Sequence, residues 1–143
     1  EIIIPQLYAQ YYEPGEFEES KSINTQDSLW LEAITFLKNG QHDEGIQQLK
    51  ILVSDSSFTH LSKAYLYMGH ALMELEAFDQ AIGAYKKVTD DRQTADWYIG
   101  LAYLGKGDAA NAIDQFRKVK NYRFYREQAE SILELLTQQN QTP

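Results

Sequence analysis

The chain has 143 residues, of which 43% are hydrophobic and 24% charged, a length and composition typical of one globular domain. It contains no cysteine, which excludes disulfide bonds, thiol catalysis and zinc sites built from cysteine. The net charge of −8 argues against nucleic acid as a partner, and no apolar run approaches the roughly 20 residues of a membrane-spanning helix, so we expect no membrane insertion by this segment.

Residues 1–25 are predicted to form an acidic and aromatic arm at the N-terminal end. The stretch "EIIIPQLYAQYYEPGEFEES" is interrupted by Pro5, Pro14 and Gly15, which favours an extended chain over a helix. Because the sequence begins with Glu1 rather than Met, we interpret it as a processed product or an excised piece.

Three copies of one pattern follow the arm, at about 26–59, 60–92 and 93–121. Each copy has a small residue in its first half (Ala33, Gly69 or Gly100), with apolar residues at three- and four-residue steps around it. The pattern breaks at "NGQHD", "LEAFD" and "GKGDA", so each copy is predicted to be a helical hairpin. The predicted helices span about 26–39, 42–54, 60–75, 78–90, 94–105 and 108–120. Since a lone hairpin cannot bury its outer face, the copies are expected to stack.

Residues 122–143 are predicted to form a capping helix and a frayed tail. In "FYREQAESILELLTQQ" the apolar residues fall on one helical stripe, made of Tyr125, Ala129, Ile132, Leu133 and Leu136. A helix at about 123–139 would cover the last apolar face of a stack of hairpins.

The third copy resembles the tetratricopeptide repeat family, through Gly100, Tyr103, Gly107-Asp108, Ala112-Ile113 and Phe116. The resemblance covers about residues 26–121. It implies an all-α, right-handed superhelix of three helix-turn-helix hairpins, with the capping helix and the extended arm added. It also implies that the first helix of each hairpin lines a concave face, where ligands lie.

The resemblance further implies positions for a clamp of Lys, Arg and Asn that holds a peptide carboxylate in this family. The matching positions here are Trp30, Ile34, Lys63, Tyr67, Thr94 and Tyr98. Only Lys63 could serve in such a clamp, so we expect none.

A mostly apolar groove is predicted on the first helices. Its residues are Trp30, Ile34, Leu37, Leu66, His70, Met73, Trp97, Leu101 and Leu104. An apolar patch of this size on a soluble protein is usually covered. We therefore predict a non-catalytic adaptor or scaffold that binds an apolar peptide or an amphipathic helix there, with both tryptophans as anchors. The alternative, which stays open, is a structural module whose own arm fills the groove, within one chain or in a swapped homodimer.

Cations are concentrated in "RKVKNYRFYR". These residues are Arg117, Lys118, Lys120, Arg123 and Arg126, and we expect them to tune the choice of partner by meeting the acidic arm or an acidic partner. The alternative for the first three is a complement to the dipole at the C-terminal end of a helix.

No catalytic or metal site is predicted. The three histidines, His42, His60 and His70, show no ligand spacing, so we expect no metal and no cofactor. The protein or peptide partner cannot be identified from the sequence. "QLYAQYYEP" is similar to the segment that follows a membrane anchor in some bacterial repeat proteins, so cytoplasmic, membrane-anchored and periplasmic locations all stay open.

Overall fold

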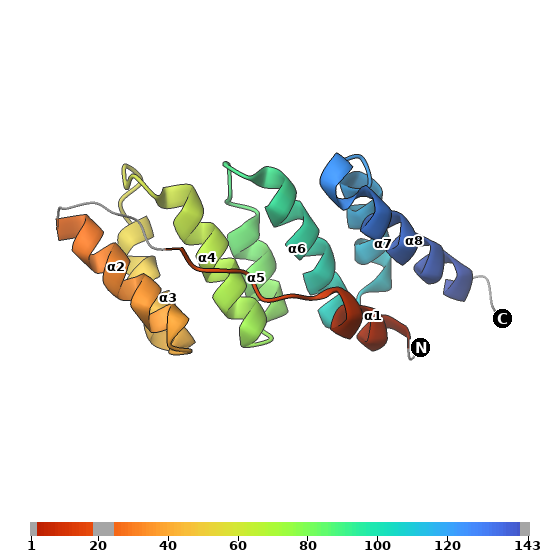
Figure 1. Cartoon of the computed structure of the whole chain (residues 1–143), viewed down its shortest axis with the longest axis horizontal. Helices are drawn as coiled ribbons and strands as arrows, with labels where there is room; N and C mark the ends of the chain where they lie inside the picture. Colours follow the sequence, from red (N-terminus) through yellow and green to blue (C-terminus); the bar gives the residue numbers. More distant parts are fainter. Residues whose placement is uncertain (1–2, 19–24, 141–143) are drawn as a thin grey trace. The chain divides into compact units, whose positions relative to one another are not determined.

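The computed structural model describes residues 3–18 and 25–140. In chain order the helices are α1 Ile3–Tyr11, α2 Thr25–Lys38, α3 His42–Val53, α4 Leu61–Glu74, α5 Phe78–Tyr85, α6 Arg92–Gly105, α7 Ala109–Val119, the short 3-10 helix η1 Arg123–Tyr125, and α8 Arg126–Asn140 (Figure 1). The all-α prediction is confirmed, because consecutive helices pack as the hairpins α2/α3, α4/α5 and α6/α7. Within the described ranges, no helix combines the length and the apolar character needed to cross a bilayer.

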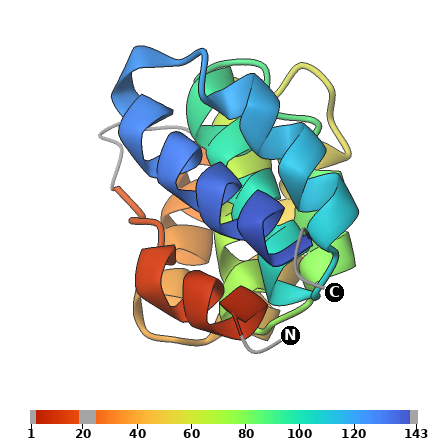
Figure 2. The same ribbon diagram turned by 90° about the vertical axis from the view of Figure 1, so that its right-hand side faces the viewer.

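The chain divides into two compact units. The double-hairpin unit, Pro14–Asp90, contains α2 to α5, and α3 packs against α4 to join its two hairpins. The single-hairpin unit combines Glu1–Glu13 with Asp91–Pro143. In this unit α8 packs along α7, while α1 contacts both α6 and α8 (Figure 2). The right-handed superhelix and the repeat boundaries stay predictions.

The N-terminal segment is helical over Ile3–Tyr11, so the extended arm predicted for residues 1–25 is wrong for this stretch. Pro5 is the third residue of α1, and in the first turn its missing N–H is not needed for an intrahelical hydrogen bond. Residues 12–18 have no regular secondary structure, as the arm prediction requires of them. Residues 1–2 and 19–24 of the predicted arm lie outside the described residues.

Helix α5 ends at Tyr85, five residues before the predicted end at about 90. The reason is a side chain from the neighbouring helix of the same hairpin. The Ser62 hydroxyl accepts hydrogen bonds from the backbone N–H groups of Thr89 (3.0 Å) and Asp90 (2.9 Å), which gives these groups partners outside the helix. The predicted cap also differs in detail, since η1 precedes α8 where one helix was expected.

The turns inside the three hairpins have the same hydrogen-bond pattern. In the second hairpin the N–H of Glu76 donates to the Met73 carbonyl (3.0 Å) and the N–H of Ala77 to the Leu72 carbonyl (2.9 Å), a Schellman-type helix end. This end requires a left-handed residue, which is Gly40 (φ 78°), Glu76 (φ 55°) or Gly107 (φ 79°) in the successive hairpins. The second hairpin therefore places a glutamate where its equivalents use glycine.

Replacing Glu76 by glycine is expected to stabilise the double-hairpin unit by about 1 kcal/mol, because a left-handed residue with a Cβ costs about 1–2 kcal/mol. Urea unfolding of the full chain measures the change. Gly107→Ala is the reverse substitution at the equivalent position of the third hairpin. An added Cβ there meets nothing within 4 Å, so a loss of stability of similar size measures the cost of the positive φ alone. A loss of stability in Glu76→Gly would contradict the argument.

Candidate functional site

The residues assigned to an apolar groove are buried in the structure, except Leu66, which is half-buried. Trp30 is 0% exposed and stacks on Tyr67, with ring centroids 5.6 Å apart and planes 6° from parallel. Trp97 is 8% exposed and stacks on Tyr125, at 5.0 Å and 11°. Each tryptophan therefore packs against a tyrosine of its own unit: Trp30 against Tyr67 on α4, and Trp97 against Tyr125 in η1. The sequence had predicted instead that both line an open groove. Whether these residues bind a partner stays a prediction.

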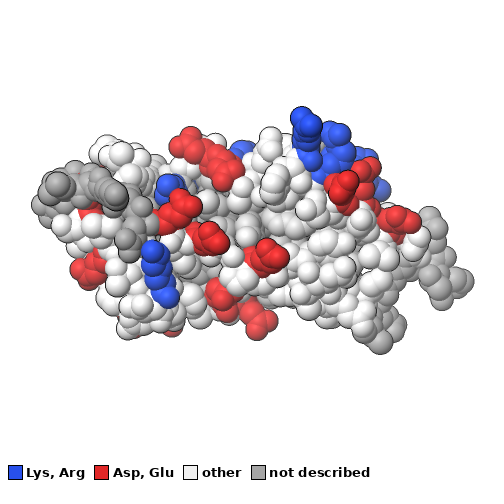
Figure 3. All heavy atoms as spheres, viewed as in Figure 1, with Lys and Arg blue, Asp and Glu red and all other residues white. Residues whose placement is uncertain are grey.

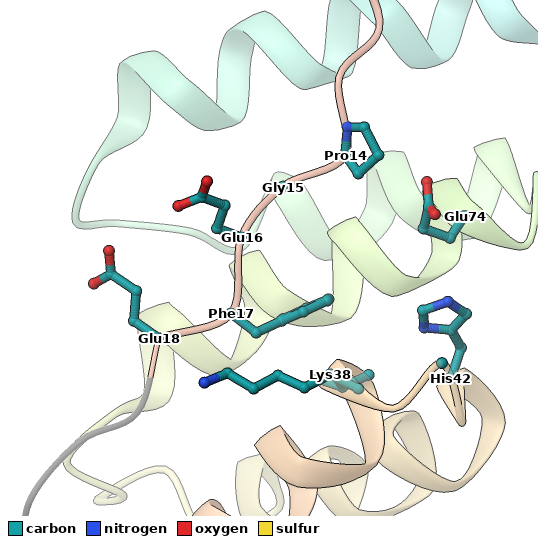
Figure 4. A pocket seen from close by; sticks show the side chains of 10 residues that line it. Pro14, Gly15, Glu16, Phe17, Glu18, Lys38, His42 and Glu74 are labelled. Atoms are coloured by element: carbon teal, nitrogen blue, oxygen red, sulfur yellow. The ribbon is translucent and has the colours of Figure 1, made fainter.

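Residues 14–18 lie across α4 in the double-hairpin unit (Figure 4). The ring of Phe17 meets Tyr67 edge to face, with centroids 5.2 Å apart, and lies 6.3 Å from the His70 ring. The backbone N–H of Glu18 donates a 3.0 Å hydrogen bond to the Tyr67 hydroxyl. Figure 4 shows Phe17 pointing to the opposite side of the chain from Glu16 and Glu18, as in an extended peptide. The aromatic side of this segment thus faces the helices.

Gly15 touches the imidazole of His70. A Cβ built on Gly15 would lie 2.1–2.2 Å from three atoms of that ring, a distance that no side chain tolerates. His70 is 4% exposed, and its Nδ1 lies 2.8 Å from the hydroxyl of Tyr85 on α5, so the ring is held from its other side. Only glycine fits at this position without movement of the ring or of the segment.

A cleft of about 500 Å³ opens beside the same segment (Figure 4). The segment forms one wall, and the other wall comes from the turn between α2 and α3 and from the end of α4, with Lys38, His42 and Glu74 among its polar residues. In the described part of the chain, no three His, Asp or Glu side chains are grouped to hold a metal ion.

The single-hairpin unit holds the preceding residues in a similar way. Tyr11 meets Trp97 edge to face (6.5 Å), and Tyr12 meets Tyr98 (6.4 Å). The Tyr98 hydroxyl donates a 2.9 Å hydrogen bond to the backbone carbonyl of Glu13. Tyr98 stands two residues before Gly100, as Tyr67 stands two residues before Gly69. Tyrosines at equivalent positions of two hairpins therefore bond to the main chain of the N-terminal segment.

Sequence reasoning missed the role of these two tyrosines. Both occupy positions that the family resemblance associates with a carboxylate clamp, in which only Lys63 was expected to serve. A phenol can donate or accept a hydrogen bond, so the same position suits a backbone amide or carbonyl. Burial raises the pKa of the Tyr67 phenol above its ordinary value, in spite of the hydrogen bond from the Glu18 N–H, and the group stays neutral near pH 7.

A buried carboxylate organises the single-hairpin unit. Asp96 is 0% exposed; its carboxylate accepts hydrogen bonds from Arg92 (2.6 Å) and from the Tyr122 hydroxyl (2.5 Å), and lies 3.4 Å from the ammonium of Lys118. Burial alone would raise the pKa of Asp96, but the hydrogen bonds from Tyr122 and Arg92 and the two positive charges outweigh it and hold the pKa below its ordinary value. In the sequence, the i,i+4 spacing of Arg92 and Asp96 is the one signal of this network.

The cations predicted to tune partner choice gather where α7 ends and α8 begins (Figure 3). Arg117 lies 3.8 Å from Asp114, Lys118 reaches Asp96, and the Arg126 guanidinium donates to the Lys120 carbonyl (3.2 Å). Arg117 and Lys118 are in the last turn of α7, as the helix-dipole alternative requires. Influence on a partner stays a prediction.

One comparison with known proteins identifies a family. Residues 94–123 match the tetratricopeptide repeat family, and the match spans most of α6, all of α7 and the first residue of η1. A search of curated proteins found no significant match. The family resemblance drawn from Gly100, Tyr103 and Phe116 is thereby confirmed for this stretch. Repeats of this kind are typically non-catalytic and suggest protein partners in general. The chain therefore contains a tetratricopeptide repeat at residues 94–123.

Proposed function

We propose that the chain is a non-catalytic protein-interaction module in which the first helix of a hairpin binds an extended peptide, with residues 14–18 of the same chain as the resident peptide on α4. The observation that supports this most directly is the contact of residues 14–18 with α4. Gly15 lies against the His70 ring, Phe17 packs on Tyr67, and the backbone N–H of Glu18 donates a hydrogen bond to the Tyr67 hydroxyl. The proposal unites the two alternatives that the sequence leaves open, a groove for a peptide and a groove filled by the arm.

The contacts made by Tyr67 and Tyr98 favour peptide binding over simple packing of a terminus. Both hydroxyls bond to backbone groups, which every peptide has, while the aromatic contacts and the glycine contact depend on the side chains. Affinity from main-chain hydrogen bonds and specificity from side-chain contacts are the division of roles found in extended-peptide recognition.

A partner peptide has to compete with the resident segment. A segment tethered in the same chain acts at an effective concentration in the millimolar range, so a free peptide of equal intrinsic affinity is excluded at micromolar concentration. Weakening the resident segment therefore raises the apparent affinity for a partner peptide without any change in the binding surface.

We expect Gly15→Ala to expose the α4 surface to added peptide. Overpacking against a held ring costs about 1–3 kcal/mol, so the variant should bind a fluorescent peptide of residues 11–18 about 5- to 160-fold more tightly than the unmodified chain does. Fluorescence anisotropy of the full chain measures this. Gly83→Ala is the matched control, because a Cβ at Gly83 meets nothing within 4 Å and leaves the resident segment in place.

A second peptide, with alanine in place of Gly15, should bind each chain more weakly than the glycine peptide does, by the same factor of about 5 to 160. Equal binding of the two peptides to the Gly15→Ala chain would contradict the proposal, as would equal binding of the glycine peptide by the Gly15→Ala and unmodified chains. Sedimentation gives the state of association. An unmodified chain that is dimeric, with a monomeric Gly15→Ala variant, would place the resident segment on a second copy instead.

A further inference from the structure

Phe124 is exposed to a degree that packing does not explain. Among the described residues the exposed large apolar side chains are Ile51, Leu75 and Phe124, and Phe124 leads them with 76% of its surface open to solvent. It belongs to η1, where its ring stands edge-on against Tyr125 with centroids 4.8 Å apart. Complete burial of a phenylalanine side chain stabilises a protein or a complex by about 1.5–3 kcal/mol. Because Phe124 stays exposed after folding, most of this stabilisation is available to a binding partner.

An aromatic cleft of about 410 Å³ opens next to Phe124 in the single-hairpin unit. Its aromatic walls are Tyr11 from α1, Trp97 and Tyr98 from α6, and Phe124 and Tyr125 from η1. Stacking of Trp97 on Tyr125 and the edge contact of Tyr11 hold these walls in place. The volume is at the small end of ligand pockets and suits one ring-sized side chain rather than a folded surface.

Positive charge surrounds the same turn. Arg117 and Lys118 have acidic neighbours, but no acidic side chain in the described ranges pairs with Lys120, Arg123 or Arg126. The stretch 117–126 contains five cations and no acid, in a chain whose net charge is −8 (Figure 3). Complementarity of charge therefore indicates a negatively charged occupant.

We propose that this surface, made of Phe124, the cleft beside it and the cations Lys120, Arg123 and Arg126, docks an acidic peptide segment of a partner protein. An aromatic or proline side chain of that segment enters the cleft, and flanking carboxylates meet the three cations. A peptide suits the surface better than a lipid headgroup or a nucleic acid backbone, because the apolar part is a concave cleft of a size for one side chain. The surface shares no residue with the contact between residues 14–18 and α4, which most directly supports the proposed function.

The test uses the full chain and a fluorescent synthetic peptide of eight residues, seven glutamates and one central phenylalanine. The probe has no glycine, so it cannot reproduce the close contact with His70, and its binding reports on the Phe124 surface alone. Anisotropy is expected to show binding that weakens about tenfold for the double variant Lys120→Glu and Arg123→Glu, and about fivefold for Phe124→Ala. Lys50→Glu, the same charge change at an exposed position in α3, should alter the affinity by less than about twofold.

Three further probes assign the ligand class. A peptide of glutamates alone should bind the unmodified chain about fivefold more weakly than the probe. The proposal is overturned if that peptide binds equally well, if the Lys120 and Arg123 charge reversals leave binding unchanged, or if phosphatidylserine vesicles or single-stranded RNA bind more tightly through the same residues. Thermal melting of each variant confirms that it is folded.

Discussion

Replacing Trp30 by alanine is expected to lower the free energy of unfolding of the double-hairpin unit by about 3–5 kcal/mol, the usual cost of removing a large buried aromatic side chain. Trp30 is 0% exposed and lies in a cluster with Phe58, His60 and Tyr67, at centroid distances of 5.7, 5.1 and 5.6 Å. The vacated volume lies between α2, α4 and the connecting segment that carries Phe58 and His60.

The measurement is urea unfolding followed by circular dichroism, with tryptophan fluorescence as a second signal. In this variant the remaining tryptophan, Trp97, belongs to the single-hairpin unit and reports on that unit only. Phe124→Ala serves as the matched control, since an exposed aromatic contributes little to folding and should change stability by less than about 0.5 kcal/mol.

Trp30→Phe separates packing from hydrogen bonding at the same position. The indole N–H of Trp30 is buried without a hydrogen-bond partner among the described residues, so a phenylalanine loses volume but no polar contact. A smaller loss than in Trp30→Ala is expected. If Trp30→Ala itself costs less than about 1 kcal/mol, the side chain lies on an open surface, as the sequence had suggested.

Asp96→Ala is expected to destabilise the single-hairpin unit by about 2–4 kcal/mol. The substitution removes the shared acceptor of Arg92 and Tyr122 and the charge partner of Lys118, which connect α6, α7 and the turn before η1. Arg92 and Lys118 are partly exposed and regain water, which keeps the loss below that of a fully buried ion pair. Asp114→Ala, at an exposed pair with Arg117, should leave stability within experimental error.

The same network predicts how stability depends on pH at both extremes. The pKa of Asp96 is lowered from 3.8, so its contribution is present above about pH 4 and is lost as the pH falls through the lower folded value. Burial and the hydrogen bond to Asp96 raise the pKa of Tyr122 from 10.0 to about 12, so its contribution is present below pH 10 and is lost as the pH rises toward 12.

Urea unfolding at a series of pH values tests both limits. In Asp96→Asn the loss of stability attributed to Asp96 in acid should disappear, and the pKa of Tyr122, followed by tyrosinate absorbance, should fall toward 10.0 because the neighbouring negative charge is gone. An unchanged tyrosine titration in this variant would show that Asp96 does not set the pKa of Tyr122.

The hairpins could be predicted from the sequence because the repeat constrains them at each step. The small residues Gly69 and Gly100 recur in register, and in the structure an aromatic ring of the second helix, Tyr85 or Phe116, lies against each of them. The turns could be placed because a helix that ends in a left-handed residue favours glycine, as at Gly40 and Gly107. Local chemistry and the repeat point to the same structure there.

The N-terminal segment could not be predicted in the same way. Pro5 was weighed as a helix breaker, although within the first turn it is compatible with a helix. The face on which Trp30 and Trp97 lie was assigned from the family resemblance, and the tyrosines that cover them, Tyr67 and Tyr125, are 37 and 28 positions away in the sequence. Contacts at that separation depend on how helices pack, which the periodicity of one helix does not contain.

The contact between Gly15 and His70 also restricts which polypeptides are candidate partners for α4. Under the proposed function, a polypeptide that replaces the resident segment on α4 has to present a glycine to the imidazole and, two residues later, an aromatic ring to Tyr67. Protein sequences can therefore be screened for an exposed Gly-x-aromatic tripeptide in an unstructured region before any binding experiment is attempted. The proteins selected in this way are the first candidates for binding experiments.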